Sequence, residues 1–318
     1  MNPKLRYAAG TWIRVQMRRL ARQFFKKTAD PRAAQHGLLR ELLALNADSE
    51  FGRRHGLEQI HSPADFRSRL PISDYAYFQP YIERMKRGET SALLGSGNRL
   101  LMFALTSGTT TGSKFLPITE RFFRDYRRGW QIWSIRAFDD HPSLYFHEIA
   151  QLTSDHEQFL TSAGHACGNI SGLVTAMQQP LVRTMYAVPG AVSKIKSPDA
   201  KYYTAMRLSL ANRIVGLITT ANPSTLIQLA KIGDGYRDEI IRDIADGTLS
   251  RRFDVPEHVR QALAGRVRRK RRRRARELEQ IIARTGRLYP KGCWTGMSLL
   301  AVWIGGSAGA YIGGLRTR

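Results

Sequence analysis

The chain has 318 residues and a formal net charge of +24, and hydrophobic residues make up 42% of it. This length and apolar content suit one large or two ordinary folded domains and argue against a wholly disordered chain. Its two cysteines, Cys167 and Cys293, exclude a disulfide framework and suit the reducing cytoplasm. Neither has a second Cys or a His at metal-ligand spacing, so no metal site is predicted.

The first predicted element is a basic amphipathic helix over residues 11–27. Apolar residues recur there at helical spacing, with Arg and Lys off that face. Such a helix can pack its apolar stripe on the domain, which we favour, or lie on an anionic membrane surface. No uninterrupted apolar secretory signal is present. We therefore divide the chain into an N-terminal helix, residues 1–27, and one domain over 28–318.

Helices with loop-rich connections are predicted next. One helix runs from about Pro31 to Leu45. The stretch from Glu50 to Glu89 is predicted to hold short helices, because Ser62 and Asp74 are residues of the kind that begin them.

A strand predicted over 100–105 leads into the segment Thr106–Lys114, here called the hydroxyl-rich loop. It is composed of Ser, Thr, two glycines and one lysine. Backbone N–H groups, hydroxyls and an ammonium group can together hold one phosphate. The alternative is a Ser/Thr-rich turn without a ligand. We expect Pro117 and Thr119 to introduce a long helix whose aromatic residues are mainly core, although some could line an acyl pocket.

In the second half, Asn222 and Pro223 are predicted to begin a helix, and another is expected from about Tyr236 to Ala245. The spacing of apolar residues predicts a single basic helix over 256–285. The uncharged stretch 292–315 is long enough to span a bilayer, but its seven glycines favour a buried strand, turn and helix.

An arginine tract, Arg266–Arg276, holds nine basic residues in eleven. It can be a solvated helix face, or a patch for RNA or an anionic surface. No aromatic residues interleave the arginines and no base-reading motif is present, so specific nucleic-acid binding is not expected.

Several phrases together resemble one family, the Gretchen Hagen three, or auxin-responsive promoter, family of acyl-acid amido synthetases within the acyl-adenylate-forming superfamily. The phrases are F-G-R-R-H-G (51–56), D-F-R-S-R-L-P-I-S-D-Y (65–75), Y-I-E-R-M-K-R-G-E (81–89), T-S-G-T-T-T-G-S-K-F-L-P-I-T (106–119), T-T-A-N-P-S-T-L-I-Q-L (219–229), I-I-R-D-I-A-D-G-T-L (240–249) and W-I-G-G-S-A-G-A-Y (303–311). The resemblance implies an α/β fold: an incomplete large N-terminal adenylation domain, with mixed sheets flanked by helices.

The resemblance also implies a chemistry. A carboxylic acid would attack the α-phosphate of ATP, and an amine or amino acid would then displace AMP to form an amide. Mg²⁺ would screen the triphosphate. The implied phosphate-binding residues are Thr106, Ser107, Gly108, Thr109, Thr110 and Gly112, with Lys114 as the catalytic lysine. Thr111 stands where superfamily loops usually carry their second glycine.

Family members continue beyond the last of these phrases into an aromatic-x-x-Ser-Glu motif, a hinge and a small C-terminal domain. None of these is found in this sequence, so we expect a truncated chain that lacks part of the active site. The alternatives are a catalytically dead fragment, or a binding protein that uses the arginine tract on RNA or on an anionic membrane.

Overall fold

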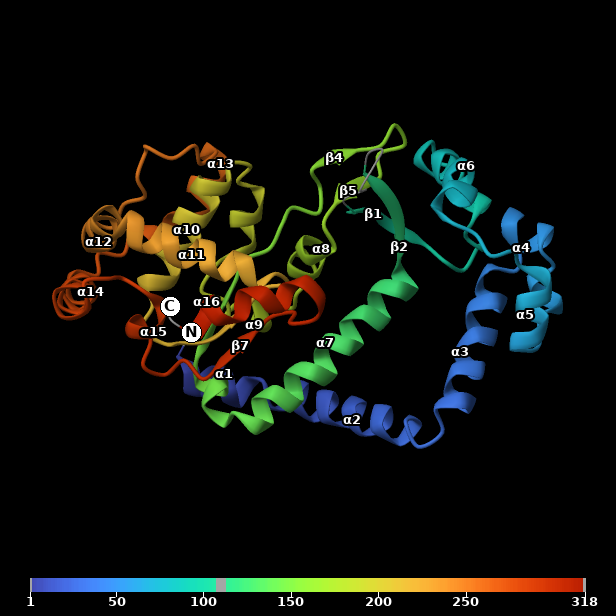
Figure 1. Cartoon of the computed structure of the whole chain (residues 1–318), viewed down its shortest axis with the longest axis horizontal. Helices are drawn as coiled ribbons and strands as arrows, with labels where there is room; N and C mark the ends of the chain where they lie inside the picture. Colours follow the sequence, from blue (N-terminus) through green and yellow to red (C-terminus); the bar gives the residue numbers. More distant parts are fainter. Residues whose placement is uncertain (1, 107–112, 317–318) are drawn as a thin grey trace. The chain divides into compact units, whose positions relative to one another are not determined.

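The computed structural model describes residues 2–106 and 113–316 (Figure 1). The chain divides into two compact units. Unit 1 comprises residues 1–11, 137–154 and 174–318, and unit 2 comprises residues 12–136 and 155–173. The one-domain prediction for residues 28–318 did not foresee these units, and the boundary predicted at residue 27 stays a prediction.

Unit 2 begins with helices, and their starts follow the capping residues of the sequence. Asp30 accepts a hydrogen bond from Ala33 N at 2.9 Å, and the Ser62 hydroxyl accepts one from Asp65 N at 3.1 Å. Asp65 in return accepts from Ser62 N at 2.9 Å, which completes a capping box. The helical elements are α2 (Thr11–Lys27), α3 (Pro31–Asn46), α4 (Glu50–Arg54), η1 (Leu57–Gln59), α5 (Pro63–Arg69), α6 (Tyr75–Lys86) and η2 (Thr90–Ala92).

A mixed four-stranded sheet lies in unit 2, in the order β2-β1-β5-β4. Strand β1 pairs antiparallel with β2 and parallel with β5, and β5 pairs antiparallel with β4. The strands are β1 (Leu100–Thr106), β2 (Lys114–Thr119), β4 (Phe159–Leu160) and β5 (Ala166–Gly168). Figure 1 shows β2 leading into the long helix α7 (Glu120–Asp140). Helix α8 (Ile170–Ala176) follows β5 and crosses into unit 1.

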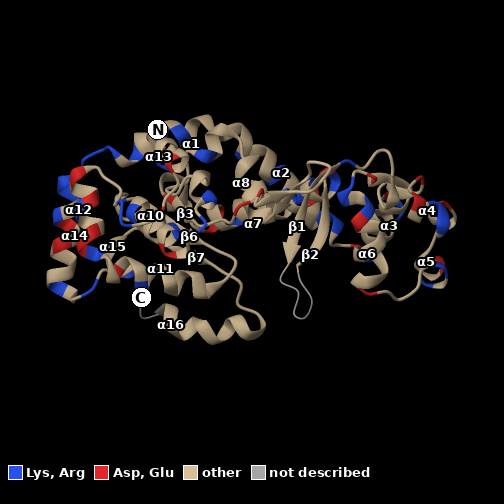
Figure 2. Ribbon diagram, turned by 90° about the horizontal axis from the view of Figure 1, so that it is seen from above, with Lys and Arg blue, Asp and Glu red and all other residues tan. Residues whose placement is uncertain are grey.

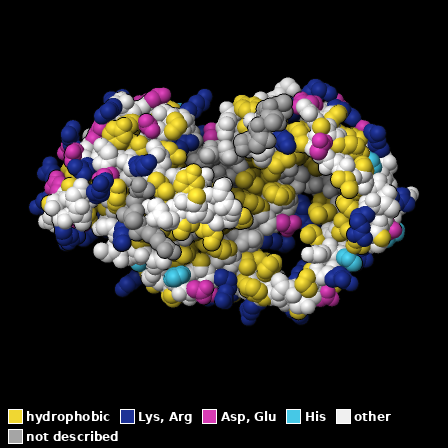
Figure 3. All heavy atoms as spheres, viewed as in Figure 1, with side chains coloured by type: hydrophobic (Ala, Val, Ile, Leu, Met, Phe, Trp, Pro, Cys, Tyr) yellow, Lys and Arg dark blue, Asp and Glu magenta, His cyan; other side chains and the backbone are white. Residues whose placement is uncertain are grey.

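Two sequence predictions for unit 2 are corrected by these elements. The prediction that Thr119 introduces a long helix is confirmed, since its hydroxyl accepts a hydrogen bond from Phe122 N at 3.2 Å at the start of α7. However, residues 114–119 form a strand, and Pro117 lies within it. Pro117 is accommodated because β2 is an edge strand, where a residue without an N–H breaks no ladder on its open side. The aromatic residues of α7 are only partly core, since Phe123 is buried whereas Phe122 and Trp130 are exposed. Figure 3 accordingly shows hydrophobic side chains on the visible surface.

Unit 1 is built on a parallel three-stranded sheet in the order β3-β6-β7. Helix α10 is buried along most of its length and contacts α11 and α12. Its Tyr203 ring stacks on Phe253 with ring centroids 4.0 Å apart. The strands are β3 (Glu148–Gln151), β6 (Val215–Thr219) and β7 (Leu299–Ala301). The helical elements of unit 1 are α1 (Pro3–Ala9), η3 (Pro142–Phe146), α9 (Pro180–Arg183), η4 (Gly190–Lys194), α10 (Pro198–Leu210), α11 (Pro223–Gly235), α12 (Arg237–Asp246), α13 (Glu257–Val267), α14 (Arg272–Thr285), α15 (Pro290–Cys293), η5 (Gly306–Tyr311) and α16 (Ile312–Arg316).

The single helix predicted over 256–285 is wrong, because it is two helices, α13 and α14. Between them, the N–H of Arg271 donates to the carbonyl oxygen of Ile244 at 2.9 Å instead of continuing the helical ladder. The adjoining backbone of Arg268 runs close to Gly247, where a Cβ atom would lie 2.6 Å from the Arg268 oxygen. Gly247 also has φ of 73°, a left-handed conformation that favours glycine.

Buried arginines connect separate segments of unit 1 by donating hydrogen bonds to backbone carbonyl oxygens. Arg207 is 1% exposed and donates to the oxygens of Thr248, Asp243 and Val267 at 2.9–3.0 Å. Arg274 donates to Leu210 O at 2.9 Å and to Cys293 O at 2.8 Å. Part of the arginine tract is therefore structural. Figure 2 marks both basic and acidic residues along α14, and several of the basic residues are exposed.

Residues 292–315 contain β7, η5 and α16, which confirms the predicted strand, turn and helix. They are not fully buried, since Trp303 is 70% exposed. Within the described parts of the chain, no helix combines the length and the apolar character that a membrane crossing requires.

Candidate phosphate-binding site and apolar cavity

Strands β1 and β2 bring the two ends of the hydroxyl-rich loop together. Thr106, the last residue of β1, lies opposite Lys114, the first residue of β2. Thr106 is half-buried and Lys114 is exposed. The other predicted phosphate-binding residues, Ser107, Gly108, Thr109, Thr110 and Gly112, lie outside the described residues. The sequence prediction that a strand leads into this loop is confirmed.

Tyr75, at the start of α6, fixes the position of the strand that carries Lys114. Its hydroxyl accepts a hydrogen bond from Phe115 N at 2.9 Å and lies 3.4 Å from Phe115 O, to which it donates. The Lys114 ammonium lies 5.4 Å from the centre of the Tyr75 ring, within range of a cation–π contact. Lys114 has no ion pair among the described residues, so its charge is available to a ligand.

A second lysine lies against the same strand but already has a partner. The Lys86 ammonium is 4.2 Å from the centre of the Phe115 ring and 2.9 Å from the carboxylate of Glu83. Its charge is therefore partly neutralised by Glu83. Of these two lysines, only Lys114 combines a position at the loop with an unneutralised charge.

Cys167, on the neighbouring strand β5, is a core residue. Its side chain is fully buried, it pairs in register with Phe103, and burial raises the pKa of its thiol. A raised pKa lowers the population of the nucleophilic thiolate. Cys167 is therefore a poor nucleophile at neutral pH. The described residues contain no group of three or more His, Cys, Asp or Glu side chains that could hold a metal ion.

Strand β5 requires glycine where it meets the preceding segment. A Cβ atom on Gly168 would lie 2.5 Å from the carbonyl oxygen of Asp155 and 2.5 Å from the carbonyl carbon of His156. The hydrogen bond from Asn169 N to Asp155 O, at 2.7 Å, fixes this close approach. This glycine is the last residue of β5, shortly before the start of α8.

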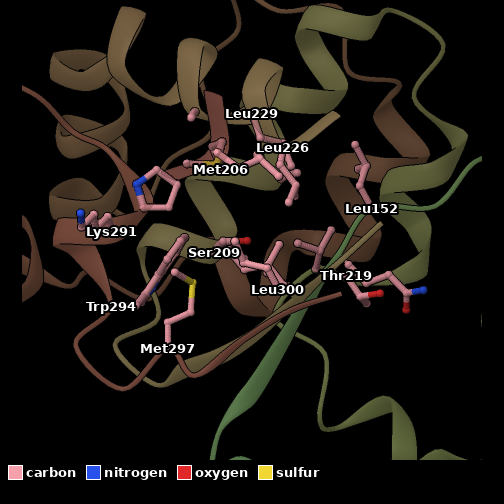
Figure 4. A pocket seen from close by; sticks show the side chains of 18 residues that line it. Leu152, Met206, Ser209, Thr219, Leu226, Leu229, Lys291, Trp294, Met297 and Leu300 are labelled. Atoms are coloured by element: carbon pink, nitrogen blue, oxygen red, sulfur yellow. The ribbon is translucent and has the colours of Figure 1, made fainter. Parts of the chain in front are cut away.

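Unit 1 contains an apolar cavity of about 190 Å³ (Figure 4). Its walls come from β3, β6, α10, α11, α15, β7 and α16. Lys291 is an exposed, positively charged lining residue without an ion pair among the described residues, and Ser209 and Thr219 contribute hydroxyls. The lining includes Met206, Leu226, Leu229, Trp294, Met297 and Leu300. A cavity of this size and character can hold a compact apolar group.

Neither Tyr75 nor the apolar cavity was predicted from the sequence. Tyr75 ends one of the family-like phrases, D-F-R-S-R-L-P-I-S-D-Y, so a signal for it was present. The cavity residues are scattered over 150–315, and no local pattern brings them together.

These two units, each with a sheet flanked by helices, define an α/β protein with a hydroxyl-rich loop between two paired strands. The profile of the GH3 family N-terminal domain matches residues 20–317, and the chain belongs to this family. This confirms the family and the fold class expected from the sequence.

Individual relatives agree with this assignment. The chain is 33% identical over 111 residues to the jasmonoyl–L-amino acid synthetase GH3.3 of Oryza sativa subsp. japonica, covering 35% of this chain and 24% of the relative. It is 26% identical over 246 residues to the indole-3-acetic acid-amido synthetase GH3.10 of Arabidopsis thaliana, covering 72% of this chain and 41% of the relative.

The fold is similar to that of a solved GH3.15 acyl acid amido synthetase, with a TM-score of 0.79 and 17% identity. That match covers 93% of this chain and 52% of the solved chain. The chain thus spans about half, or less, of the proteins it matches.

Proposed function

We propose that this chain supplies the adenylation part of an acyl-acid amido synthetase. In the first step, a carboxylate oxygen attacks the α-phosphorus of ATP, the bond to the β-phosphate breaks, and pyrophosphate leaves. In the second, the nitrogen of an amine or amino acid attacks the acyl carbon. The bond to AMP breaks, AMP leaves, and the nitrogen loses a proton to form the amide.

The pairing of Thr106 with Lys114 carries this proposal, together with membership of a family that uses ATP. Because the carboxylate is already a nucleophile, the first step needs positioning and charge neutralisation more than a strong base. The loop hydroxyls and backbone N–H groups would hold the phosphates. The Lys114 ammonium, which Tyr75 helps to position, would stabilise the negative charge that develops on the leaving pyrophosphate.

Mg²⁺ would arrive as part of the substrate, bound to the phosphates of ATP. The described residues offer no cluster of metal-ligating side chains, so no protein ligand for the ion is proposed. Mg²⁺ commonly keeps several waters and binds through substrate phosphates, which agrees with such a site.

The apolar cavity of unit 1 suits the acid substrate. Its volume and lining fit an acid with a compact, ring-sized apolar body, and Lys291 would attract the carboxylate. Replacing Lys291 with Met keeps an unbranched side chain but removes the charge. The proposal expects Lys291→Met to raise the KM for the acid while leaving the KM for ATP unchanged. An unchanged KM for the acid would exclude this role.

The main test is acid-dependent exchange of labelled pyrophosphate into ATP with Mg²⁺ and a panel of carboxylic acids. Lys114→Ala and Ser107→Ala should each reduce exchange, by about tenfold to a thousandfold if each removes one group that stabilises the transition state. The matched control is Lys27→Ala, which removes another exposed lysine charge of unit 2 and should leave exchange intact. Equal activity of Lys114→Ala and Lys27→Ala would reject the assigned role of Lys114.

The same assay separates the alternative functions. A catalytically dead fragment would give no exchange with any acid. Amide formation, followed by mass spectrometry with a panel of amino acids, tests the second step separately. A role of the arginine tract in RNA recognition would require sequence-selective binding that persists at moderate salt, whereas binding that falls steeply with salt reports only electrostatic attraction.

A further inference from the structure

A second cavity in unit 1, of about 110 Å³, is lined by charged side chains. It lies where the end of α13, the start of β3 and the C-terminal end of α10 meet. Its lining includes four arginines, Arg207, Arg266, Arg269 and Arg271, and a single carboxylate, Glu148. We call it the arginine cavity.

The protein fixes most of these side chains in place. Arg266 Nη1 donates to Tyr186 O at 2.7 Å and to Ala187 O at 3.0 Å. Arg271 Nη1 donates to Ala211 O at 3.2 Å. Glu148 accepts a hydrogen bond from the Asn212 amide at 2.6 Å. The arginine cavity is therefore built from positioned groups and is not a gap among mobile surface chains.

The charges of the arginine cavity are not balanced from within. The hydrogen-bond acceptors of Arg207, Arg266 and Arg271 are neutral backbone carbonyls. Only nearby carboxylates, Asp243 for Arg207 and Glu148 for Arg266, offset part of the positive charge. Arg269 has no hydrogen-bond or ion-pair partner among the described residues, and it lies close enough to Arg266 to disfavour the charge of that side chain. One lining carboxylate thus faces four cations. Each guanidinium carries five N–H donors, of which the carbonyl contacts use only some.

We propose that the arginine cavity binds a small phosphate-type oxyanion, such as inorganic phosphate or pyrophosphate. Arginine matches the geometry of phosphate oxygens with paired N–H donors. A water molecule occupies about 30 Å³ in the liquid, so the cavity has room for a tetrahedral oxyanion. This site belongs to unit 1 and shares no residue with the hydroxyl-rich loop of unit 2.

The test is isothermal titration calorimetry of the whole chain with inorganic phosphate and with pyrophosphate, at constant ionic strength. Arg269→Gln removes an exposed lining charge without removing a described contact, and binding should weaken about tenfold. Glu148→Gln removes the opposing negative charge and should strengthen binding. Lys27→Ala, which removes an exposed charge of unit 2, should have no effect. Anion binding at the hydroxyl-rich loop, as the proposed adenylation site, would appear as a component that Arg269→Gln leaves unchanged, so the failure of either site can be distinguished.

Arg272→Gln is the matched control, because it removes an exposed charge of the same tract that does not line the cavity. It should change affinity less than twofold. Equal weakening by Arg269→Gln and Arg272→Gln would show general attraction to the tract and overturn the proposal. Absence of saturable binding of either anion to the unmodified chain would also overturn it.

Discussion

Tyr75 hydrogen-bonds to both backbone polar groups of Phe115, the residue that follows Lys114. Its hydroxyl lies 2.9 Å from Phe115 N and 3.4 Å from Phe115 O. Helix α6 thereby holds the first residues of β2 in place through one side chain. A residue without contact to any substrate can in this way determine where Lys114 lies.

Tyr75→Phe should therefore impair function as well as stability. Loss of the hydroxyl should lower the free energy of unfolding by about 1 kcal/mol, measured by urea denaturation. It should also weaken binding of ATP, because the start of β2 is no longer fixed.

The matched control is Tyr77→Phe on the same helix. That hydroxyl hydrogen-bonds to His55 Nε2 at 2.8 Å, away from β2. Its loss should cost a similar free energy of unfolding but leave ATP binding unchanged. Equal effects of the two substitutions on ATP binding would contradict the positioning role of Tyr75.

Gly168→Ala should destabilise unit 2, because the new methyl group would overlap the Asp155 carbonyl and the His156 backbone. We expect a cost of about 1–3 kcal/mol, as for overpacked cores. Gly129, in the middle of α7, has no atom within 4 Å of a built Cβ. Gly129→Ala should therefore stabilise the chain by about 0.5–1 kcal/mol. Thermal and urea unfolding of both variants measure whether Gly168→Ala lowers and Gly129→Ala raises the free energy of unfolding.

Arg207→Lys should be costly although it conserves the charge. A lysine ammonium cannot reproduce the fork with which Arg207 reaches Thr248 O, Asp243 O and Val267 O. Loss of one or two of these buried hydrogen bonds should cost about 2–4 kcal/mol. Arg276→Lys, at an exposed position of α14, is the control and should be nearly neutral. An Arg207→Lys variant as stable as the unmodified chain would refute this account of the unit 1 core.

Glu148→Gln should stabilise the chain at pH 7. Burial raises the pKa of Glu148 despite the nearby charges of Arg266 and Arg6 and the hydrogen bond from Asn212. A carboxyl group whose pKa is higher in the folded state binds its proton more tightly there. Its ionisation therefore lowers the free energy of unfolding as pH rises from the unfolded-state pKa toward the folded-state pKa. This cost is present above the folded pKa, and glutamine avoids it.

The advantage of Glu148→Gln should shrink as pH falls through the folded pKa and disappear below the unfolded value of about 4.3. Urea unfolding at several values between pH 4 and pH 7 measures this difference. Glu279→Gln, at an exposed position of α14, serves as the control. A destabilising effect of Glu148→Gln at pH 7 would mean that the ion pairs outweigh the cost of burial.

Local signals in the sequence were sufficient for most helix starts. The side chains of Ser62, Asp74 and Asn222 each accept a hydrogen bond from a first-turn N–H, as their positions before helices predict. Strand β1 was also predicted, because its apolar run ends directly at the hydroxyl-rich loop. The loop residues 107–112 remain predictions.

Contacts between residues far apart in the sequence determine the features that local sequence patterns did not predict. The break between α13 and α14 depends on the hydrogen bond of Arg271 N to Ile244 O, more than twenty residues earlier in the chain. The helical spacing of apolar residues continues across that break, so the sequence pattern predicts one helix. Likewise, the local sequence around Pro117 predicts a helix start, but Pro117 lies in β2, a strand at the edge of the sheet. The arginine cavity joins residues from 148 to 271 and has no local pattern.

The bonds of buried arginines to carbonyl oxygens have a consequence in alkaline solution. Burial lowers the pKa of Arg207 and of Arg274, but a guanidinium group starts from a pKa far above that of a lysine ammonium group. Segments joined by guanidinium groups therefore stay joined at pH values where ammonium groups begin to lose their protons. Their acceptors are uncharged, so acid cannot remove these contacts by protonating a carboxylate. The carbonyl contacts of Arg207 and Arg274 therefore depend on no carboxylate, unlike the additional contact of Arg274 with Glu277.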